Sequence, residues 1–506
     1  MPHPFDENRV RVVSPGRSRK GDFVLLWMQR ERRLSHNHAL DWAIDRAREL
    51  RLPLVIYEEL TLDLPWPNLR HWRFFLEGLR DNAFEATSRG FPYWPHVPMR
   101  PSQRSPLSSL ARRAAIVVTD DFPVSPVPEK TKHLASRIEA PVIAIDGNGL
   151  VPLALLGPPP PVARSLRPRL HRALLDVWKH RATPHPTADG LVTKRLEPPF
   201  RLWTPDDLDR DLARMPVDRS VPAAPLCGGA HAAEARLADF VANKLRGYAK
   251  HHAKPLPPDE AFTSGLSPYL HAGHISIAQV VEAVLGATGG ASLRRFVPEA
   301  MGDKTRFFGA DEDANAFLDE ALVWRDLCHL FLWHRREDVA SLQRALPEWA
   351  WASWNAHRRD RRRFVYSFEE WENGATHDEL WNAAQRELVA TGHLHGYLRM
   401  LWGKKVLEWS ESPEQAYGTL VALNDKYALD GSDPCSYGNI LWCFGLFDRP
   451  WFPERPVLGR IRYMSSESTA RKFSLGAYLR YVASLPTIAE ARTAPRTSVE
   501  LAPPPA

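Results

Sequence analysis

The stretch HGYLRMLWGKK, residues 395–405, combines aromatic, thioether and cationic side chains in one short run. It contains no proline and continues into VLEW, so the pattern predicts a helix. Side chains three and four positions apart share a helix face. One stripe then consists of Tyr397, Met400 and Lys404, and the other of Arg399, Trp402, Val406 and Trp409. Because a buried charge needs a partner, we expect a polar group or a counter-charge to lie against Arg399.

A second candidate site is the run TSGLSPYLHAGHIS, where small and hydroxyl residues precede an apolar helical pattern. The residues at the expected helix start are Ser264, Gly265, Leu266 and Ser267. Hydroxyls and free backbone N–H groups at such a start suit an anion such as phosphate. A plain helix N-cap by Ser264 or Ser267 is the alternative interpretation.

The run FLDEALVWRDL predicts a helix on which Glu320 and Trp324 share a face, with Arg325 adjacent. A carboxyl group beside an aromatic ring suits the binding of a planar base. A half-buried core tryptophan is the alternative.

Three later segments add aromatic, acidic and basic side chains of the same kinds. They contribute Trp381 (THDELWNAAQRELV), Asn424, Asp425 and Asp430 (LNDKYALDGSDP), and Trp442, Arg449, Arg460 and Arg462 (NILWCFGLFDRPW and GRIRYM). The carboxylates of the middle segment are candidate partners for Arg399. The four cysteines form no CxxC pair, so we expect neither a metal site nor a disulfide framework. We expect the protein to reside in a reducing compartment.

The elements that position these residues fall into two domains. Residues 22–150 alternate helical patterns with the apolar runs 23–28, 52–57, 114–120 and 140–146, which predict a doubly wound parallel sheet. Residues 151–229 are rich in proline and predict a long inter-domain linker. Residues 230–487 predict a large helical domain, and we expect residues 1–21 and 488–506 to be disordered. The α/β domain has no GxGxxG, so a dinucleotide fingerprint is not supported there.

Composition excludes some classes of protein. The net charge of +6 over 506 residues is only mildly basic, so an argument for a nucleic-acid partner rests on local clusters such as HRRDRRR at 357–363. That cluster is equally well read as a solvated surface turn. We see no apolar run of membrane-spanning length and no signal peptide. We therefore expect a cytoplasmic monomer with no membrane association and no obligate protein partner.

Taken in order, SGLSPYLHAGHIS, THDELWNAAQ, HGYLRMLWGKKVLEWSESPEQA, LNDKYALDG and GRIRYM resemble the photolyase/cryptochrome family of flavoproteins. The resemblance is to the class II cyclobutane pyrimidine dimer (CPD) photolyases. It covers roughly residues 22–480 and includes the opening WMQRERRLSHNHAL. It implies an N-terminal Rossmann-like antenna domain and a C-terminal helical domain that binds FAD, reduced and anionic in the active form.

The resemblance also implies roles for individual residues. The FAD phosphates would be held by Tyr248, Ser264, Gly265, Leu266, Ser267 and Arg325. Asn424 would face the flavin, and Arg399 would pair with Asp430 near the ring. Trp402 and Trp381 would carry electrons to the flavin, with Trp409 as a branch, although core packing is the alternative for all three.

The implied substrate is UV-damaged DNA carrying a pyrimidine dimer that is flipped out of the duplex. The residues that would contact it are Trp324, Tyr397, Met400, Trp442, Arg449, Arg460 and Arg462. Glu320 would hydrogen-bond a pyrimidine, and burial would raise its pKa so that it can donate a proton. Light would drive an electron from reduced FAD to the dimer, which splits into two pyrimidines, and the electron would then return.

The chain departs from the class II pattern at three positions: His38, His329 and Leu330. The end of the α/β domain also lacks the usual lysine near the antenna pocket, so a deazaflavin antenna and an empty pocket both remain open. The rival readings are a cryptochrome-like blue-light sensor without repair, a (6-4) photolyase and a colourless helical DNA-binding module. The presence of Glu320, Trp324, Met400 and Trp442 together favours dimer repair over the sensor.

Overall fold

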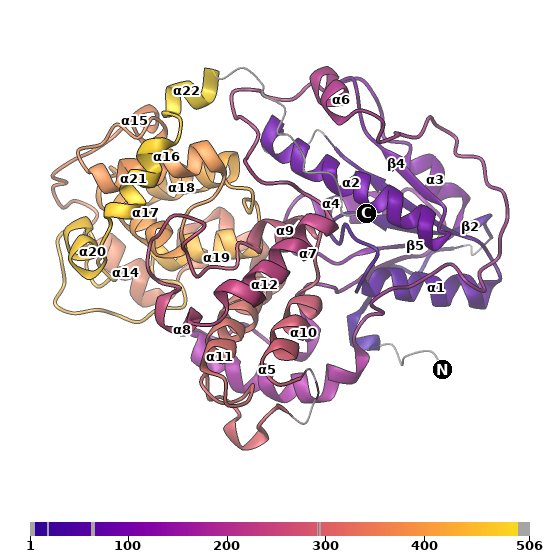
Figure 1. Cartoon of the computed structure of the whole chain (residues 1–506), viewed down its shortest axis with the longest axis horizontal. Helices are drawn as coiled ribbons and strands as arrows, with labels where there is room; N and C mark the ends of the chain where they lie inside the picture. Colours follow the sequence, from indigo (N-terminus) through magenta and orange to yellow (C-terminus); the bar gives the residue numbers. More distant parts are fainter. Residues whose placement is uncertain (1–5, 18–19, 62–65, 291, 293–294, 494–506) are drawn as a thin grey trace.

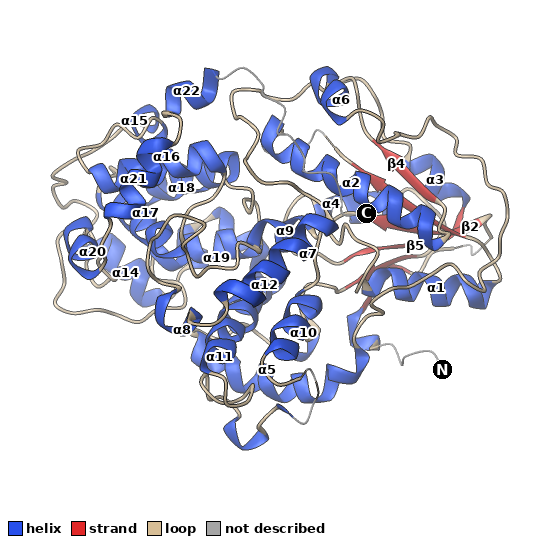
Figure 2. Cartoon of the chain, viewed as in Figure 1, coloured by secondary structure: helices blue, strands red, loops and turns tan. Residues whose placement is uncertain are grey.

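The computed structural model describes residues 6–17, 20–61, 66–290, 292 and 295–493. The chain forms an N-terminal domain built on one sheet and a larger helical domain beside it (Figure 1). The strands are confined to the first domain (Figure 2). The predicted fold class, an α/β domain followed by an all-helical domain, is confirmed.

Six strands form the sheet in the order β1-β6-β5-β2-β3-β4. They are β1 (Val10–Ser14), β2 (Phe23–Met28), β3 (Leu54–Glu59), β4 (Tyr93–His96), β5 (Ala114–Asp120) and β6 (Val142–Ile145). The neighbouring pairs are parallel except β1–β6, which is antiparallel. The four predicted strands form the parallel centre of the sheet, as expected. The sequence did not predict the two edge strands: β1, antiparallel, lies in a segment that was expected to be disordered, and β4, parallel, closes the opposite edge.

Helices cover both faces of the sheet, and β2 shows why its sequence is continuously apolar. Its side chains alternate between the faces, and every one of them is buried. Leu26 packs in one cluster with residues of α1 (His38–Leu50), whereas Leu25 packs on the other face with residues of α3 (Leu107–Arg113) and α4 (Val127–Ala135). The long helix α2 (Leu69–Arg89) lies between the sheet and the helical domain (Figure 1).

The predicted linker and tails are more ordered than expected. The linker contains α5 (Ala163–Val177) and α6 (Leu208–Arg214), and Arg167 of α5 forms a bidentate ion pair with Asp319, with distances of 2.6 and 2.9 Å. The short helix Glu7–Arg9 and β1 contradict disorder in the N-terminal segment, and α22 (Ile488–Thr493) contradicts it at the start of the C-terminal tail. Residues 1–5, 18–19 and 494–506 lie outside the described residues.

The helical domain follows the linker. Its helices are α7 (Ala230–Asp239), α8 (Tyr248–His251), α9 (Ser267–Ala272), α10 (Ile277–Ala287), α11 (Glu312–Leu318), α12 (Arg325–Arg335), α13 (Leu342–Ala345), α14 (Glu348–Ala356), α15 (Phe368–Glu372), α16 (Glu379–Thr391), α17 (Gly396–Glu408), α18 (Pro413–Tyr427), α19 (Pro434–Cys443), α20 (Ser466–Lys472) and α21 (Gly476–Ser484). Two π-helical turns, Phe240–Lys244 and Asp319–Trp324, continue α7 and α11. The predicted helix over residues 395–405 is α17.

The two domains are tied together by arginines that donate to backbone carbonyls. Arg70 of α2 is buried and donates to the carbonyl oxygens of Val389 at 2.6 Å and Tyr427 at 2.7 Å. Burial lowers its pKa to about 9. Arg30 donates to the carbonyl of His271 at 2.7 Å. Gly273 follows two residues later with a φ of +76°, and a Cβ there would lie 1.7 Å from the Arg30 carbonyl oxygen, so only glycine permits this approach.

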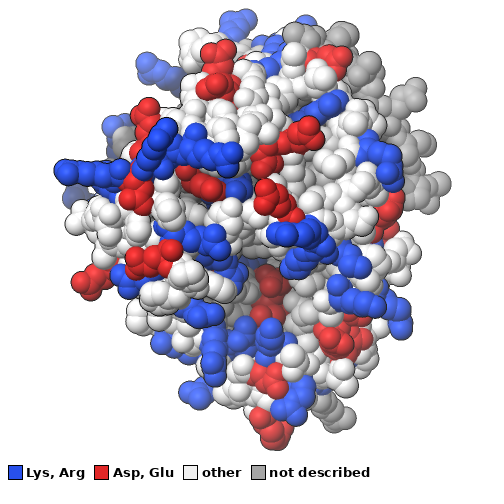
Figure 3. All heavy atoms as spheres, turned by 90° about the vertical axis from the view of Figure 1, so that its left-hand side faces the viewer, with Lys and Arg blue, Asp and Glu red and all other residues white. Residues whose placement is uncertain are grey.

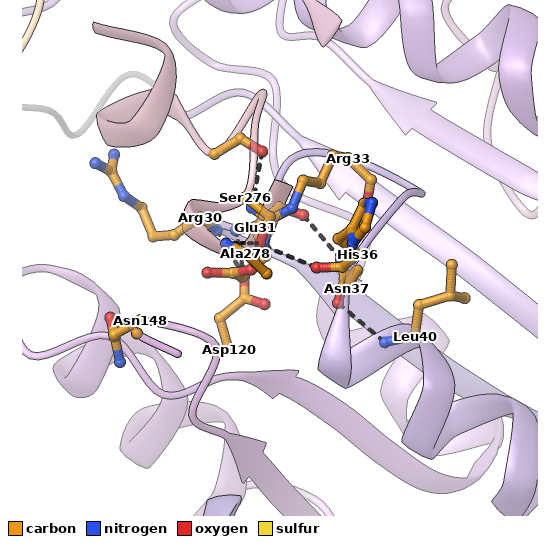
Figure 4. Close-up of polar contacts among 12 residues, drawn as sticks. Arg30, Glu31, Arg33, His36, Asn37, Leu40, Asp120, Asn148, Ser276 and Ala278 are labelled. Carbon is orange, nitrogen blue, oxygen red and sulfur yellow. Dashed lines mark hydrogen bonds and ion pairs between the residues drawn. The ribbon is translucent and has the colours of Figure 1, made fainter. Parts of the chain in front are cut away.

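The loop after β2, which carries the opening motif, is shaped by two side chains (Figure 4). Asp120 at the end of β5 accepts backbone N–H bonds from Arg30 at 2.6 Å and from Glu31 at 3.2 Å. Asn37 caps α1 by accepting from the N–H of Leu40 at 3.0 Å. The motif therefore fixes the loop that meets the helical domain.

Candidate active site

An ion pair lies where the sequence requires a partner for the arginine stripe of α17. Arg399 donates to both carboxylate oxygens of Asp430, at 3.0 and 3.2 Å, and Asp430 stands in the turn after α18. Burial acts to raise the pKa of Asp430, but the charge and hydrogen bonds of Arg399 outweigh it, so the pKa lies below its usual value. The expected counter-charge is confirmed.

The Ser264–Ser267 segment lies beside this ion pair. The Ser267 hydroxyl hydrogen-bonds Asp430. Ser267 is exposed although Leu266 and Pro268 on either side are buried, and α9 has no side-chain cap, so the N-cap alternative is wrong. A Cβ built on Gly265 would lie 3.6 Å from the Cδ of Arg236 on α7. Arg236 is a cation that the sequence reasoning missed, since nothing in the spacing relates α7 to this segment.

Aromatic and imidazole rings form the next part of the site. The Tyr248 ring stacks on His252 at 4.6 Å with an interplanar angle of 12°. His395, which caps α17, is buried, and its Nε2 has no hydrogen-bond partner among the described residues. Burial lowers the pKa of His395 to about 4, so its ring is neutral. An unpaired buried polar atom here is consistent with a site for a polar ligand.

Glu320 lies on the π-helical turn Asp319–Trp324, a rare local geometry that often marks functional sites. The residue is exposed, yet enough protein surrounds its carboxyl group to raise its pKa to about 7, with the nearby charge of Asp319 adding to the effect. Because its carboxyl group is both accessible and partly desolvated, we place Glu320 in the wall of a recess. Burial raises the pKa of Tyr248, and the negative charge of Glu320 adds to this effect.

Asn424 is buried near the end of α18. Its Nδ2 donates to Asp425 at 3.2 Å, and Asp425 also accepts from the backbone N–H of Ser432 at 2.8 Å and from the hydroxyl of Tyr437 at 3.1 Å. The Asp425 carboxylate therefore fixes the orientation of the Asn424 amide.

Three of the candidate substrate residues, Trp442, Arg462 and Arg449, lie together with Trp451 and Lys404. The Lys404 ammonium lies 4.7 Å from the Trp442 ring centroid, and the Arg462 guanidinium 5.6 Å from it. Arg462 also lies 4.2 Å from the centroid of Trp451, and Arg449 lies 4.4 Å from the same ring. On the face of the molecule that lies at the left of Figure 1, basic side chains surround a hollow in which acidic side chains lie deeper (Figure 3). The residues Trp324, Tyr397, Met400 and Trp442 are all half-buried, as stacking surfaces open to a ligand would be.

Three predicted phosphate-binding residues have other partners. Arg325 donates to the carbonyl of Asn148 in the α/β domain and lies 3.5 Å from Asp326, so its contacts are at the domain interface. Arg460 pairs with Glu454 at 3.1 Å, and Arg462 lies 3.7 Å from Asp448. A phosphate-binding role for each of these residues stays a prediction.

The residues that depart from the class II pattern are all buried. The Nδ1 of His329 donates to the Arg325 carbonyl at 2.9 Å, and the ring packs edge-on against Phe122 of the α/β domain; burial lowers the pKa of His329 to about 3. Burial also lowers the pKa of His38. Both rings are therefore neutral packing groups, and Leu330 is part of the core.

The tryptophans proposed as electron carriers are buried side chains. Trp381 and Trp402 are stacked at 6.3 Å with an interplanar angle of 6°, and the Trp381 indole N–H donates to the Trp402 carbonyl at 3.0 Å. Trp371 of α15, which the sequence reasoning missed, packs against both Trp381 and Trp409.

Over the described ranges, no three His, Cys, Asp or Glu side chains are grouped so that they could hold a metal ion. None of the described helices is both long and apolar enough to cross a membrane. The helical domain instead contains cations, hydroxyls and half-buried ring surfaces, together with a carboxyl group, that of Glu320, whose pKa is raised to about 7.

Comparison with known proteins places this geometry in context. No family model matches the chain. The chain is 33% identical over 471 residues to the deoxyribodipyrimidine photo-lyase of Methanothermobacter thermautotrophicus, covering 92% of this chain and 96% of the relative. It is 34% identical to the protein of the same name from Oryza sativa subsp. japonica, covering 94% of this chain and 91% of the relative. Among solved structures, a class III photolyase from Agrobacterium tumefaciens has a TM-score of 0.62 at 23% identity, covering 91% of this chain and 86% of that chain.

Proposed function

The chain belongs to the photolyase/cryptochrome family, and from that premise we propose that it is a class II photolyase that splits cyclobutane pyrimidine dimers in UV-damaged DNA. The observation that carries the proposal is Glu320: an accessible carboxyl group with a pKa raised to about 7, on the same turn as the half-buried Trp324. Repair of a dimer needs a proton donor to a pyrimidine carbonyl and an apolar surface for the paired bases. Glu320 and Trp324 supply both.

FAD fits the residues beside Glu320. Ser264–Ser267 and Arg236 offer hydroxyls and a cation to the phosphates, and the unpaired Nε2 of His395 offers a further polar contact. The Arg399–Asp430 pair and the fixed amide of Asn424 would lie toward the flavin ring. When bound and reduced, FAD supplies the electron that light releases to open the cyclobutane ring.

The chain's own residues bind and orient the dimer. Glu320, protonated, donates a hydrogen bond to a pyrimidine oxygen and stabilises the negative charge that develops there. Trp324 and Trp442 stack on the extruded bases, with Tyr397 and Met400 completing the apolar surface. Arg449 and Arg462, held on Trp451, are aimed at phosphates that flank the lesion.

A second hollow, between the sheet and the helical domain, suits an antenna chromophore. Its cavity volume is about 70 Å³, and about 740 Å³ when the open solvent at its mouth is included, and the aromatic side chains in its lining are Trp27, Trp72, Phe75 and Phe122. Arg32 and Lys130 stand beside these rings. We propose that a planar, anionic chromophore such as a deazaflavin binds there.

The repair assay tests the proposed function. The purified protein is loaded with FAD, reduced chemically and mixed with an oligonucleotide that carries one thymine dimer. Chromatography then compares samples kept in blue light and in darkness. Intact thymines that form only in the light support photolyase function. A flavin-loaded protein that repairs nothing in the light refutes it and favours the light-sensor alternative, which the fold alone does not exclude.

A further inference from the structure

Four tryptophan rings form one continuous series through the helical domain. Trp402 and Trp381 are stacked at 6.3 Å, Trp381 and Trp371 meet at 4.8 Å with an interplanar angle of 62°, and Trp371 and Trp409 are stacked at 6.1 Å and 5°. Each ring is at most 3% exposed. Among the described residues, Trp381 and Trp409 form no ring contact with each other, whereas each contacts Trp371.

We propose that Trp371 is an electron carrier that links Trp381 to Trp409, so that the route to the flavin runs through four tryptophans; this rests on the proposed flavin function. Indole is the side chain most suited to the task, because its large ring gives up an electron and accepts one from a neighbour. The position of Trp371 is rigidly defined: it lies on α15, whose start is closed by a capping box between Ser367 and Glu370.

The hydrogen bonds of the indole N–H groups indicate whether an oxidised ring can lose its proton. The indole N–H of Trp402 donates to Gln385 at 2.9 Å, and that of Trp381 donates to the Trp402 carbonyl. The indole nitrogen of Trp371 is buried and has no partner among the described residues. An oxidised Trp371 therefore has no acceptor for its proton, stays positively charged and is refilled by the next ring.

Trp409 lies at the outer end of the series. Its ring is 4.6 Å from His377, which is exposed, and 6.4 Å from Phe364, and the Lys405 ammonium lies 5.0 Å from its centroid. Glu408 pairs with Lys405 at 2.7 Å and offsets its charge, which would otherwise oppose a positive hole on Trp409. This end of the series is the one nearest to solvent.

The electron balance is simple. Trp402 gives one electron to the light-excited oxidised flavin, and one electron then passes inward from Trp381, from Trp371 and from Trp409 in turn. Trp409 is left one electron short and releases its indole proton to water. A thiol reductant added to the solution returns one hydrogen atom, that is, one electron and one proton, to Trp409.

Replacement of Trp371 by Phe tests the proposal, because Phe keeps an apolar ring but is much harder to oxidise. Trp354→Phe is the matched control: Trp354 is equally buried in the same domain but has no ring contact with the four carriers. Flash photolysis measures the lifetime of the tryptophan radical, and steady blue light with thiol measures the rate at which oxidised FAD is reduced.

We expect Trp371→Phe to shorten the radical lifetime and to slow photoreduction by about tenfold or more, as one blocked step would. Trp354→Phe should change neither. The variants Trp409→Phe and Trp371→Phe/Trp409→Phe should match Trp371→Phe, because both residues serve one route and their effects are not additive. Dimer repair by chemically reduced Trp371→Phe should equal that of the wild type.

Three results would overturn the inference: a normal radical lifetime in Trp371→Phe, an equal slowing in Trp354→Phe, or slowing in Trp409→Phe alone. Flavin content and the melting temperature of each variant show whether it is folded. Failure of the proposed function is a different result, since the wild type would then bind no flavin or would repair no dimer after chemical reduction.

Discussion

The pH dependence of repair follows from the raised pKa of Glu320. At a pKa of about 7 the carboxyl group is about half protonated at pH 7 and about one-tenth protonated at pH 8. A glutamate with its usual pKa would be only about 0.3% protonated at pH 7. Because the protonated form is the hydrogen-bond donor, repair should fall as the pH rises through about 7, by about fivefold between pH 7 and pH 8.

Glu320→Gln provides the direct comparison. Glutamine keeps an N–H donor at the same position and has no proton to lose, so its repair rate should be lower than that of the wild type at pH 6.5 but should not fall between pH 6.5 and pH 8. Lys404, whose pKa burial lowers to about 8, is a second group whose titration would affect this range. Lys404→Met removes its contribution from both profiles.

The assay is single-turnover repair of a one-dimer oligonucleotide by chemically reduced protein at a fixed light dose. Dark binding is measured at each pH, so that loss of DNA affinity is not mistaken for loss of repair. A wild-type rate that is flat from pH 6 to pH 8.5, or a Glu320→Gln variant that retains the full wild-type decline in the Lys404→Met background, would refute the assignment of Glu320 as the proton donor.

Three further predictions concern the ion pair, the domain interface and the basic rim. Asp430→Asn leaves Arg399 without its carboxylate, so flavin content and the free energy of unfolding should both fall, the latter by about 2 kcal/mol because the pair is only partly buried; unchanged urea melts would contradict this. Asp326 is buried with the Arg325 guanidinium 3.5 Å from one of its oxygens, and burial outweighs that charge and raises its pKa from 3.8 to about 7. The folded state therefore holds this proton more tightly than the unfolded state, so this group lowers the stability of the wild type as the pH rises from about 4 to 7. Asp326→Asn should raise the free energy of unfolding by about 2–4 kcal/mol at pH 8 but by little at pH 4. A variant with the same unfolding midpoint as the wild type at both pH values would refute this. Arg449→Ala and Arg462→Ala should each lower the slope of log affinity against log salt by about 1 for any DNA sequence, and an unchanged slope would mean that the residue meets no phosphate.

The sequence predicts those elements whose residues carry a local pattern. The strand β2 reads as buried because every one of its residues is apolar, and α17 reads as a helix because no proline interrupts it. The sequence predicts that Arg399 has a counter-charge, because an arginine among buried rings needs one. The partner could be named only through the family resemblance.

Local patterns also misled the interpretation in identifiable ways. The edge strand β1 is half-exposed and polar, and β4 is four residues long with Pro95 in it, so neither resembles a buried strand. The linker was read as irregular because of its prolines, but α5 accommodates Pro168 inside the helix.

Residues that act through contacts between distant segments had no signal in the sequence at all. Arg236 reaches Gly265 from another helix, and Trp371 joins Trp381 and Trp409 across three separate elements. The same holds for Arg325, whose observed partner, the carbonyl of Asn148, belongs to the other domain. Such contacts depend on how helices pack together, which residue spacing along one helix does not encode.

The most direct test of the central claim uses one chemically reduced preparation and two oligonucleotides, one with a thymine cyclobutane dimer and one with a (6-4) lesion. Each is irradiated with blue light or kept dark, and restored thymines are counted per bound flavin. The account predicts many cyclobutane dimers repaired per flavin in the light, none in the dark, and no repair of the (6-4) lesion. Repair of the (6-4) lesion alone, or of neither lesion by a flavin-loaded protein, would contradict it.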